Sequence, residues 1–359
     1  MLRGRMEQPR MADLPLDRLQ PVPPFTFVGV DFFGPLAIRN KRKDEKRYGA
    51  VFSCLSSRAV HIEVAQSMDT SSFIGCLRRM IARRGPVKLL RSDNGLNFVG
   101  AEREMLDALN EMDKEKVRVY LNDRGSDFQG WKRNPPVASN FGGVWERQIR
   151  TIRAILSSLL IDHGHCLNDE TFRTLICEVE AIMNSRPLTV DNLSDPESPL
   201  PLTPAMMLTQ KTQVFFPPPG EFEKNDVYSR RHWRRTQYLA NQFWSRFRRE
   251  YLESLQPRQK WNQYRPNISQ GDIVLLKEEN LPRNKWKLGL VTEAFPDDKG
   301  VVRSVRVRVG DRTSNHVGPF HTPMYHRPAN KMVLLHRASE DQKKIPDEGA
   351  QEINPDQED

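Results

Sequence analysis

The stretch Val87-Lys-Leu-Leu-Arg-Ser-Asp-Asn-Gly-Leu-Asn-Phe98 begins as a short apolar strand and ends in a polar corner. Asn94-Gly95 is a strong turn dipeptide, and Asp93 directly before it has two interpretations. Asp93 either caps the next helix or supplies a carboxylate at the carboxyl end of a central strand, where α/β proteins hold their active sites. The choice depends on which other acidic residues the fold brings to the same place.

The composition is that of a globular protein. The chain has 359 residues, 38% hydrophobic and 28% charged, which gives room for two or three domains. No run approaches the roughly 18 apolar residues of a membrane span, and the start lacks the apolar core of a signal peptide, so we expect a protein that is not secreted. The four cysteines form no CxxC pair and are expected to be buried thiols, not a disulfide framework or zinc site: Cys54, Cys76, Cys166 and Cys177.

The charge favours a polyanionic partner, most simply nucleic acid. The formal net charge is +9, and residues 229–265 contain ten Arg or Lys against Glu250 and Glu253. Residues 338–359 reverse the sign, with eight acidic residues against Lys343 and Lys344, and have no aromatic residue. This tail is expected to be disordered.

The first half of the chain predicts a mixed α/β domain over 25–186. After an extended lead-in at 1–24, the expected strands are 25–33, 48–55, 59–65, 87–91 and 127–133, with a charged loop at 39–47. The expected helices begin at Asp69-Thr70-Ser71-Ser72, cover roughly 97–123, start again at Val144, and cover 168–184. The order of three strands, a helix and a strand favours a ribonuclease-H-like core, which is a mixed five-stranded sheet with helices.

The second half predicts a different organisation. Residues 187–228 contain eight prolines and read as a linker, and 229–265 read as a basic amphipathic helix. Short strands at 272–277, 285–295, 301–309 and 331–335 predict a small all-β, SH3-like barrel over 266–337.

Two further carboxylates stand out. Asp31 is a lone acid in the apolar strand Phe27-Val-Gly-Val-Asp-Phe-Phe-Gly-Pro-Leu36, where an unpaired charge is costly. It either caps a turn near Gly34-Pro35 or binds a metal. Glu146 follows the loop Gly142-Gly143 at the start of a helix, where the helix dipole alone would favour an acidic residue.

Together the three acids predict a metal centre. Asp31, Asp93 and Glu146 can converge in a ribonuclease-H-like fold, and hard oxygen ligands suit two Mg²⁺ (or Mn²⁺) ions. Such ions activate an attacking oxygen and stabilise a leaving oxygen in phosphoryl transfer. Asp31 would bridge both ions, while Asp93 and Glu146 would each hold one.

At these residues the chain resembles the D,D,E catalytic core of retroelement integrases, most closely those of Pao/BEL-type retrotransposons. The matching text is VGVDFFGPL, LLRSDNGLNFVG and FGGVWERQIRTIR, and the likeness covers roughly residues 20–190. The basic helix and barrel after residue 225 resemble the carboxy-terminal region of the same polyproteins. The interval between Asp93 and Glu146 is longer than in retroviral integrases, with the excess at 101–123. The family's zinc module has no counterpart, so we expect a segment of a longer polyprotein.

The resemblance also implies DNA contacts. The basic residues Arg150 and Arg153 share or neighbour the helix face of Glu146 and are expected to touch the end of the element's DNA. Further candidates are Arg147, Asn94, Arg234, Arg235, Lys285 and Lys287, with Arg303, Arg306 and Arg308 on the barrel. A solvated helix face is the alternative for the first two, and a charged hairpin tip is the simpler interpretation of Lys41-Arg42-Lys43.

The sequence therefore predicts a metal-dependent polynucleotidyl transferase that processes DNA 3′ ends and transfers them to target DNA. We expect a homo-multimer that acts in the nucleus on double-stranded DNA, with chromatin as a further candidate partner of the barrel. The alternatives are a catalytically silent, integrase-derived DNA- or chromatin-binding protein and, less favoured, a ribonuclease H, which would need a fourth acidic ligand.

Overall fold

Contacts within the chain divide it into two compact units. The computed structural model of the chain describes residues 15–40, 43–92, 119, 130–133, 145–190, 201–211, 217–256, 267–278, 281–309 and 323–338. Unit 1 comprises residues 1–186, 203–250 and 282–285, and unit 2 comprises residues 187–202, 251–281 and 286–359. The residues expected to form a linker are shared between the units, and the domain limits read from the sequence remain a prediction.

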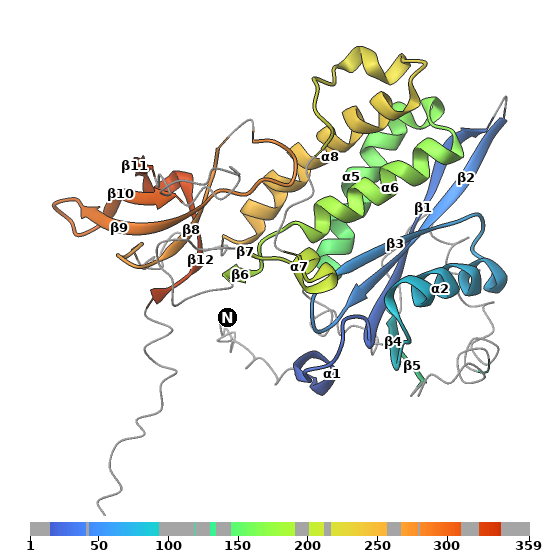
Figure 1. The fold of residues 1–359 in the computed structure, drawn as a ribbon, viewed down its shortest axis with the longest axis horizontal. Coiled ribbons are helices and arrows are strands. Elements are labelled where there is room, and N and C mark those ends of the chain that lie inside the picture. The colour runs from blue at the N-terminus through green and yellow to red at the C-terminus, as the bar shows by residue number, and fades with distance from the viewer. Residues whose placement is uncertain are drawn as a thin grey trace, which may run out of the picture. The chain divides into compact units, whose positions relative to one another are not determined.

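Unit 1 is built on a mixed sheet (Figure 1). Its strands are β1 (Phe27–Asn40), β2 (Lys43–Cys54), β3 (Val60–Ala65), β4 (Leu89–Ser92) and β5 (Gly130–Arg133). The spatial order is β3-β2-β1-β4-β5, in which β2 is antiparallel to β1 and β3, while β4 is parallel to β1 and β5. The predicted five-stranded mixed sheet with helices is therefore confirmed.

The charged loop expected at 39–47 is wrong, because most of it is strand. The β1–β2 ladder continues outward through Ile38 opposite Glu45 to Asn40 opposite Lys43. Arg39 lies opposite Asp44, and opposite charges across an antiparallel pair stabilise it. Only Lys41 and Arg42 at the tip lie outside the described residues. The lead-in also differs from expectation, because Leu16–Leu19 form the short helix α1.

Helices pack on both sides of this sheet. These helices are α2 (Thr70–Arg84), α5 (Trp145–His163) and α6 (Asp169–Asn184). Unit 1 also contains α7 (Pro204–Thr209), the 3₁₀ turns η2 (Gly164–Cys166) and η3 (Lys224–Tyr228), and α8 (His232–Ser254) as far as Glu250. The predicted start of α2 is confirmed, because the Asp69 side chain accepts a hydrogen bond from the Ser72 amide at 2.6 Å. Gly85 ends α2 with a φ of 94°, which favours glycine.

Alternation along β1 assigns each face of the sheet to a helix. Phe32 belongs to the apolar cluster that contains Phe73, Leu77 and Met80 of α2. Asp31, one residue earlier, points to the opposite face, as neighbouring strand residues do. There it contacts Arg153 of α5. Helices α2 and α5 therefore cover opposite faces of β1.

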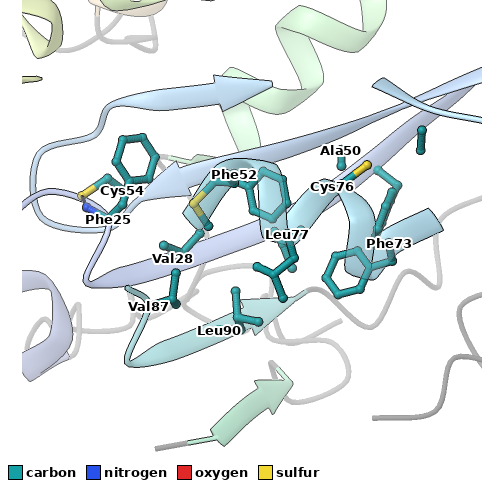
Figure 2. Close-up of a cluster of buried hydrophobic side chains, with 14 of the residues drawn as sticks. Phe25, Val28, Ala50, Phe52, Cys54, Phe73, Cys76, Leu77, Val87 and Leu90 are labelled. Carbon is teal, nitrogen blue, oxygen red and sulfur yellow. Dashed lines mark hydrogen bonds between the residues drawn. The ribbon is translucent and has the colours of Figure 1, made fainter. Parts of the chain in front are cut away.

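The cluster under α2 is the main core of unit 1. Figure 2 shows Leu77 of α2 between Phe52 of β2 and Leu90 of β4, with Phe73 of α2 at one end of the cluster and Val28 of β1 toward the other. All five side chains are at most 1% exposed. Burial of one such side chain contributes about 1.5–3 kcal/mol, so this cluster fixes the helix on the three strands.

Unit 2 contains a five-stranded antiparallel sheet. Its strands are β8 (Ile273–Leu276), β9 (Leu288–Pro296), β10 (Val302–Val309), β11 (Met324–Pro328) and β12 (Met332–His336), in the order β11-β10-β9-β8-β12. Four strands agree with the predicted ones, and β11 was not predicted. Within the described residues β11 and β12 form the two edges and do not pair, so closure into an SH3-like barrel remains a proposal. A small pair, β6 (Thr189–Val190) and β7 (Pro201–Leu202), completes the unit.

Both faces of the unit 2 sheet are packed. Val274 and Leu276 of β8 belong to one apolar cluster, and Ile273 and Leu275 belong to another. The second cluster includes Leu252 at the end of α8. The alternation follows from the two-residue period of a strand.

Several expectations fall outside the described residues. They concern Asp93, Asn94, the loop 139–143, the acidic tail and, apart from residue 119, the helix at 97–123. The cysteine prediction is half right: Cys54 and Cys76 are buried, but Cys166 is partly exposed and Cys177 is exposed, and none forms a disulfide.

Gly49 tests the packing of the β1–β2 pair. It lies opposite Phe33, and a Cβ added to Gly49 would fall 2.1 Å from the Phe33 ring. We predict that Gly49→Ala lowers the free energy of unfolding by about 1–3 kcal/mol, because the buried ring must shift. Urea denaturation measures this change.

The matched control is Gly75→Ala in α2, where the added Cβ meets only Nη1 of Arg79 at 3.5 Å. This variant is expected to gain up to about 1 kcal/mol from helix propensity. Equal stability of the Gly49→Ala variant and the wild type would contradict the packing of Phe33 on Gly49.

Candidate active site

Asp31 occupies the interior of β1, next to the end of its pairing with β4. The parallel register runs from Phe27 opposite Leu89 to Val30 opposite Ser92, so Asp31 is the next residue of β1. On the other side it lies opposite Val51 of β2, and β1 continues beyond it. Asp31 is therefore in the interior of the strand and not at its end, and the β1–β2 register shifts only later, between Phe33 and Leu36.

The Asp31 carboxylate has a defined orientation. Oδ1 accepts a hydrogen bond from the Phe32 amide at 2.7 Å. Oδ2 accepts one from Nη2 of Arg153 at 3.2 Å, and the two side chains are 25% and 26% exposed. The carboxylate is thus paired with a cation and still accessible to solvent.

Helix α5 brings Arg153 to this position. Its apolar side chains Ile149, Ile152, Ile155, Leu156 and Leu160 are buried, as the sequence pattern predicted. Nη2 of Arg153 also donates a hydrogen bond to the Phe32 carbonyl at 2.8 Å, which ties α5 to the backbone of β1. Arg150, one turn earlier, is exposed.

The other predicted ligands are described only in part. Glu146 and Arg147 lie in the first turn of α5, but their side chains are outside the described residues, as are Asp93 and Asn94 altogether. Glu146 precedes Arg153 by two helical turns, a rise of about 10 Å on the same side of the helix. Among the described residues no three His, Cys, Asp or Glu side chains form a metal-binding group.

Two of the predicted DNA contacts, Arg234 and Arg235, have partners within the chain. Arg234 forms a two-point ion pair with Asp226, at 2.6 and 3.0 Å, and its guanidinium lies over the rings of Phe222 and Trp233. Arg235 donates hydrogen bonds to the carbonyls of Cys166, Val227 and Ser229. These contacts fasten the start of α8, and a role in DNA binding remains a prediction for both residues.

The basic residues of the unit 2 sheet also have acidic neighbours. Ion pairs join Lys287 to Glu278 at 2.6 Å, Arg303 to Asp297 at 3.0 Å and Arg306 to Glu293 at 2.7 Å. Arg308 is half-buried on β10, and Lys285 lies three residues before β9 and belongs to unit 1. Exposed pairs of this kind contribute little to stability and can be exchanged for other partners.

A buried charged cluster was missed by sequence reasoning. His61 of β3 lies between two carboxylates: Nε2 is 3.0 Å from Glu63 Oε1, and Nδ1 is 3.1 Å from Glu180 Oε2 of α6. Arg79 pairs with Glu63 at 2.6 Å, and Arg84 pairs with Glu180. The His61 side chain is 1% exposed, so the cluster joins α2, β3 and α6 and offers no access to a substrate.

The contacts within the cluster shift the pKa values of its residues. Burial lowers the pKa of His61, but hydrogen bonds with Glu180 and Glu63 outweigh it, so the pKa lies above the ordinary 6.5. Burial raises the pKa of Glu63 and of Glu180, but the hydrogen bond with His61 and the neighbouring arginines outweigh it, so both pKa values lie below 4.5. The cluster is therefore stable with both carboxylates ionised and His61 protonated.

One protein family and several solved structures are similar to this chain. Residues 231–335 match a family of unknown function, DUF5641, and no curated protein matches the chain. A simian T-cell lymphotropic virus intasome in complex with PP2A regulatory subunit B56 gamma is similar over 92% of this chain and 84% of that one, with 13% identity and a TM-score of 0.35. Within the described residues, no helix is long and apolar enough to span a membrane.

Two structures of the HTLV-2 integrase catalytic core domain in complex with magnesium are also similar. The dimeric form has 16% identity and a TM-score of 0.28, over 46% of this chain and 90% of that one. The trimeric form has 16% identity and a TM-score of 0.31, over 53% and 99%.

The buried cluster predicts a specific pH dependence. The stability due to protonated His61 is complete below its unfolded pKa of 6.5 and is lost as the pH rises through its raised folded pKa. The stability due to Glu63 and Glu180 is complete above 4.5 and is lost as the pH falls through their lowered pKa values. The contribution of the cluster to the free energy of unfolding, measured by urea denaturation, should therefore be greatest and constant between pH 4.5 and 6.5.

His61→Gln tests the assignment. At pH 6 the free energy of unfolding of this variant should be about 2 kcal/mol lower than that of the wild type. The difference should shrink toward pH 9. The control His165→Gln changes an exposed histidine in η2 and should leave the profile unchanged. A His61→Gln difference that is constant from pH 6 to 9 would show that His61 is neutral in the folded protein.

Proposed function

We propose that the chain is a metal-dependent polynucleotidyl transferase of the integrase type, with Asp31, Asp93 and Glu146 as its metal ligands. The observation that carries this proposal is the register of the parallel β1–β4 pair. Its last pair is Val30 opposite Ser92, and the next residues are Asp31 and Asp93. One more residue in register would put both carboxylates on the same face of the sheet, because paired positions share a face.

The third acid belongs to the helix on that same face. Arg153 of α5 contacts Asp31, and Glu146 lies two turns toward the beginning of α5. The Gly-rich loop before α5 would allow this first turn to adjust around a ligand. Both features support convergence of Glu146 with the two aspartates.

The environment of Asp31 fits a divalent cation. Its carboxylate is partly exposed, has one oxygen fixed by the Phe32 amide, and already has the guanidinium of Arg153 on the other oxygen as a stand-in cation. Mg²⁺ takes such oxygen ligands, and two bound ions would supply activation of the attacking oxygen and stabilisation of the leaving oxygen.

The chain's own residues would position the nucleic acid. The exposed Arg150 and the neighbouring Arg153 would contact backbone phosphates next to the carboxylates. The net charge of +9 supports association with DNA through its phosphates. Assignment to Pao/BEL-type elements, a multimeric state, action in the nucleus and an SH3-like barrel that binds DNA or chromatin are parts of the same proposal.

The test is a strand-transfer assay with the full chain, a branched DNA that mimics the joined product, and Mg²⁺ or Mn²⁺. Wild-type protein should nick or join this DNA only with metal. Asp31→Asn and Glu146→Gln should each lower the rate by at least about a hundredfold, because each removes a charged metal ligand.

The matched control is Asp162→Asn, which removes an exposed carboxylate from the other end of α5 and should retain activity. DNA binding without metal-dependent cleavage, unaffected by Glu146→Gln, would contradict the enzymatic proposal. That result would favour a catalytically silent DNA-binding protein.

A further inference from the structure

The chain itself supplies a cation to Asp31. Nη2 of Arg153 lies 3.2 Å from Oδ2 of Asp31, on the same side of the sheet as helix α5. The contact joins residues 122 positions apart in the sequence and depends on the packing of α5 against β1. If Asp31 binds a metal ion through Oδ2, its contact with the Arg153 guanidinium has to break.

We infer that Arg153 is a positioning residue that holds Asp31 in the metal-free protein and releases it to a divalent cation. The inference rests on the proposed function, because it takes Asp31 to be a metal ligand. In the metal-free state the guanidinium offsets the charge of the carboxylate, which stands in an otherwise apolar strand. When the cation arrives, Arg153 becomes available for a phosphate beside it.

The hydrogen bonds around Asp31 suit such an exchange. The same Nη2 of Arg153 that contacts Asp31 also donates to the Phe32 carbonyl, at the shorter distance of 2.8 Å. This second bond can retain the guanidinium near the site after the Asp31 contact breaks. Oδ1 of Asp31 stays bound to the Phe32 amide, so the carboxylate keeps its orientation during the exchange.

Partial exposure makes the exchange possible. Both side chains are about one quarter exposed, so solvent and a cation can reach the contact. The His61 cluster is the opposite case, because its histidine is 1% exposed and separation of that pair would leave a buried charge. Of these two ion pairs, only the one at Asp31 can change partners at low cost.

The exchange couples two binding events. A cation at Asp31 frees Arg153 for DNA, and DNA that engages Arg153 leaves Asp31 open to the cation. Coupling of this kind is reciprocal, so DNA must raise metal affinity by the same factor by which metal raises DNA affinity. In a variant without the Arg153 charge, metal affinity rises and this part of the coupling disappears.

The experiment measures Mn²⁺ binding to the full chain without DNA, by electron paramagnetic resonance of the free ion. Arg153→Gln removes the charge and keeps a hydrogen-bond donor for the Phe32 carbonyl. It should bind Mn²⁺ about fivefold more tightly than the wild type, as expected for removal of a competing, partly exposed cation. Asp31→Asn should lose this binding in both backgrounds.

Two controls separate charge from general damage. Arg78→Gln removes an exposed positive charge from α2, on the opposite face of the sheet, and should leave Mn²⁺ affinity within about twofold of wild type. Arg153→Lys keeps the charge and should also stay within about twofold. Far-ultraviolet circular dichroism checks that Arg153→Gln folds. If it does not fold, Arg153→Lys is used in its place. Mn²⁺ binding by Arg153→Lys that is fivefold tighter than wild type would overturn the inference, because this variant keeps the positive charge.

The outcomes distinguish the inference from the proposed function. Equal or weaker Mn²⁺ binding by folded Arg153→Gln, with binding still dependent on Asp31, overturns the exchange and leaves the metal site intact. Absence of Asp31-dependent Mn²⁺ binding in wild type and in Arg153→Gln alike overturns the metal site itself.

Discussion

Strand β1 is paired on both sides, antiparallel to β2 and parallel to β4, and this double pairing constrains everything around it. The two ladders hold the strand in place from Phe27 to Val30, and the side chains that follow alternate between the two faces of the sheet. Phe32 faces α2 and joins the apolar core, and Asp31 faces α5 and meets Arg153. Phe32 thus packs into the core on the α2 face of the sheet, while the neighbouring Asp31 places a charge on the α5 face.

Unit 1 contains two kinds of ion pair, which differ in their exposure to solvent. The His61 cluster joins α2, β3 and α6 away from solvent, with its carboxylates held ionised by the histidine and arginines. Its function is structural. The Asp31–Arg153 pair has similar chemistry but partial exposure, and it lies where β1 leaves its parallel pairing with β4. Exposure, more than the identity of the charged groups, separates a structural pair from one that can exchange with a metal ion and a phosphate.

Patterns local in sequence predicted the fold of unit 1 well. The cap at Asp69, the apolar periodicity of α5 and the order of strands and helices along the chain from β1 to β4 each follow from local patterns, and the structure confirms them. The outer part of the β1–β2 hairpin was misread as a loop because its residues are charged. Pairing across the ladder, such as Arg39 opposite Asp44, stabilises these residues as strand.

Contacts that join distant residues could not be predicted. Glu180, one partner of His61, and Arg153, the partner of Asp31, each lie more than a hundred positions away in the sequence, and nothing local indicates either contact. The partners of Arg234 and Arg235 could not be predicted from the sequence either. Their basic character suggested phosphate contacts, but their partners in the fold are Asp226 and backbone carbonyls. A pattern of basic residues predicts that each of them binds an anion or a hydrogen-bond acceptor. Which group it binds depends on the tertiary packing.

The most direct test of the central claim, convergence of three carboxylates on one metal site, is affinity cleavage with Fe²⁺ in place of Mg²⁺. Iron bound at the site generates radicals that cut the nearby backbone, and mass spectrometry of the fragments locates the cuts. The account predicts cuts clustered around residues 31, 93 and 146, all suppressed by excess Mg²⁺ and by Asp31→Asn. Cuts near only one of these positions, or at places unaffected by Asp31→Asn, would contradict it.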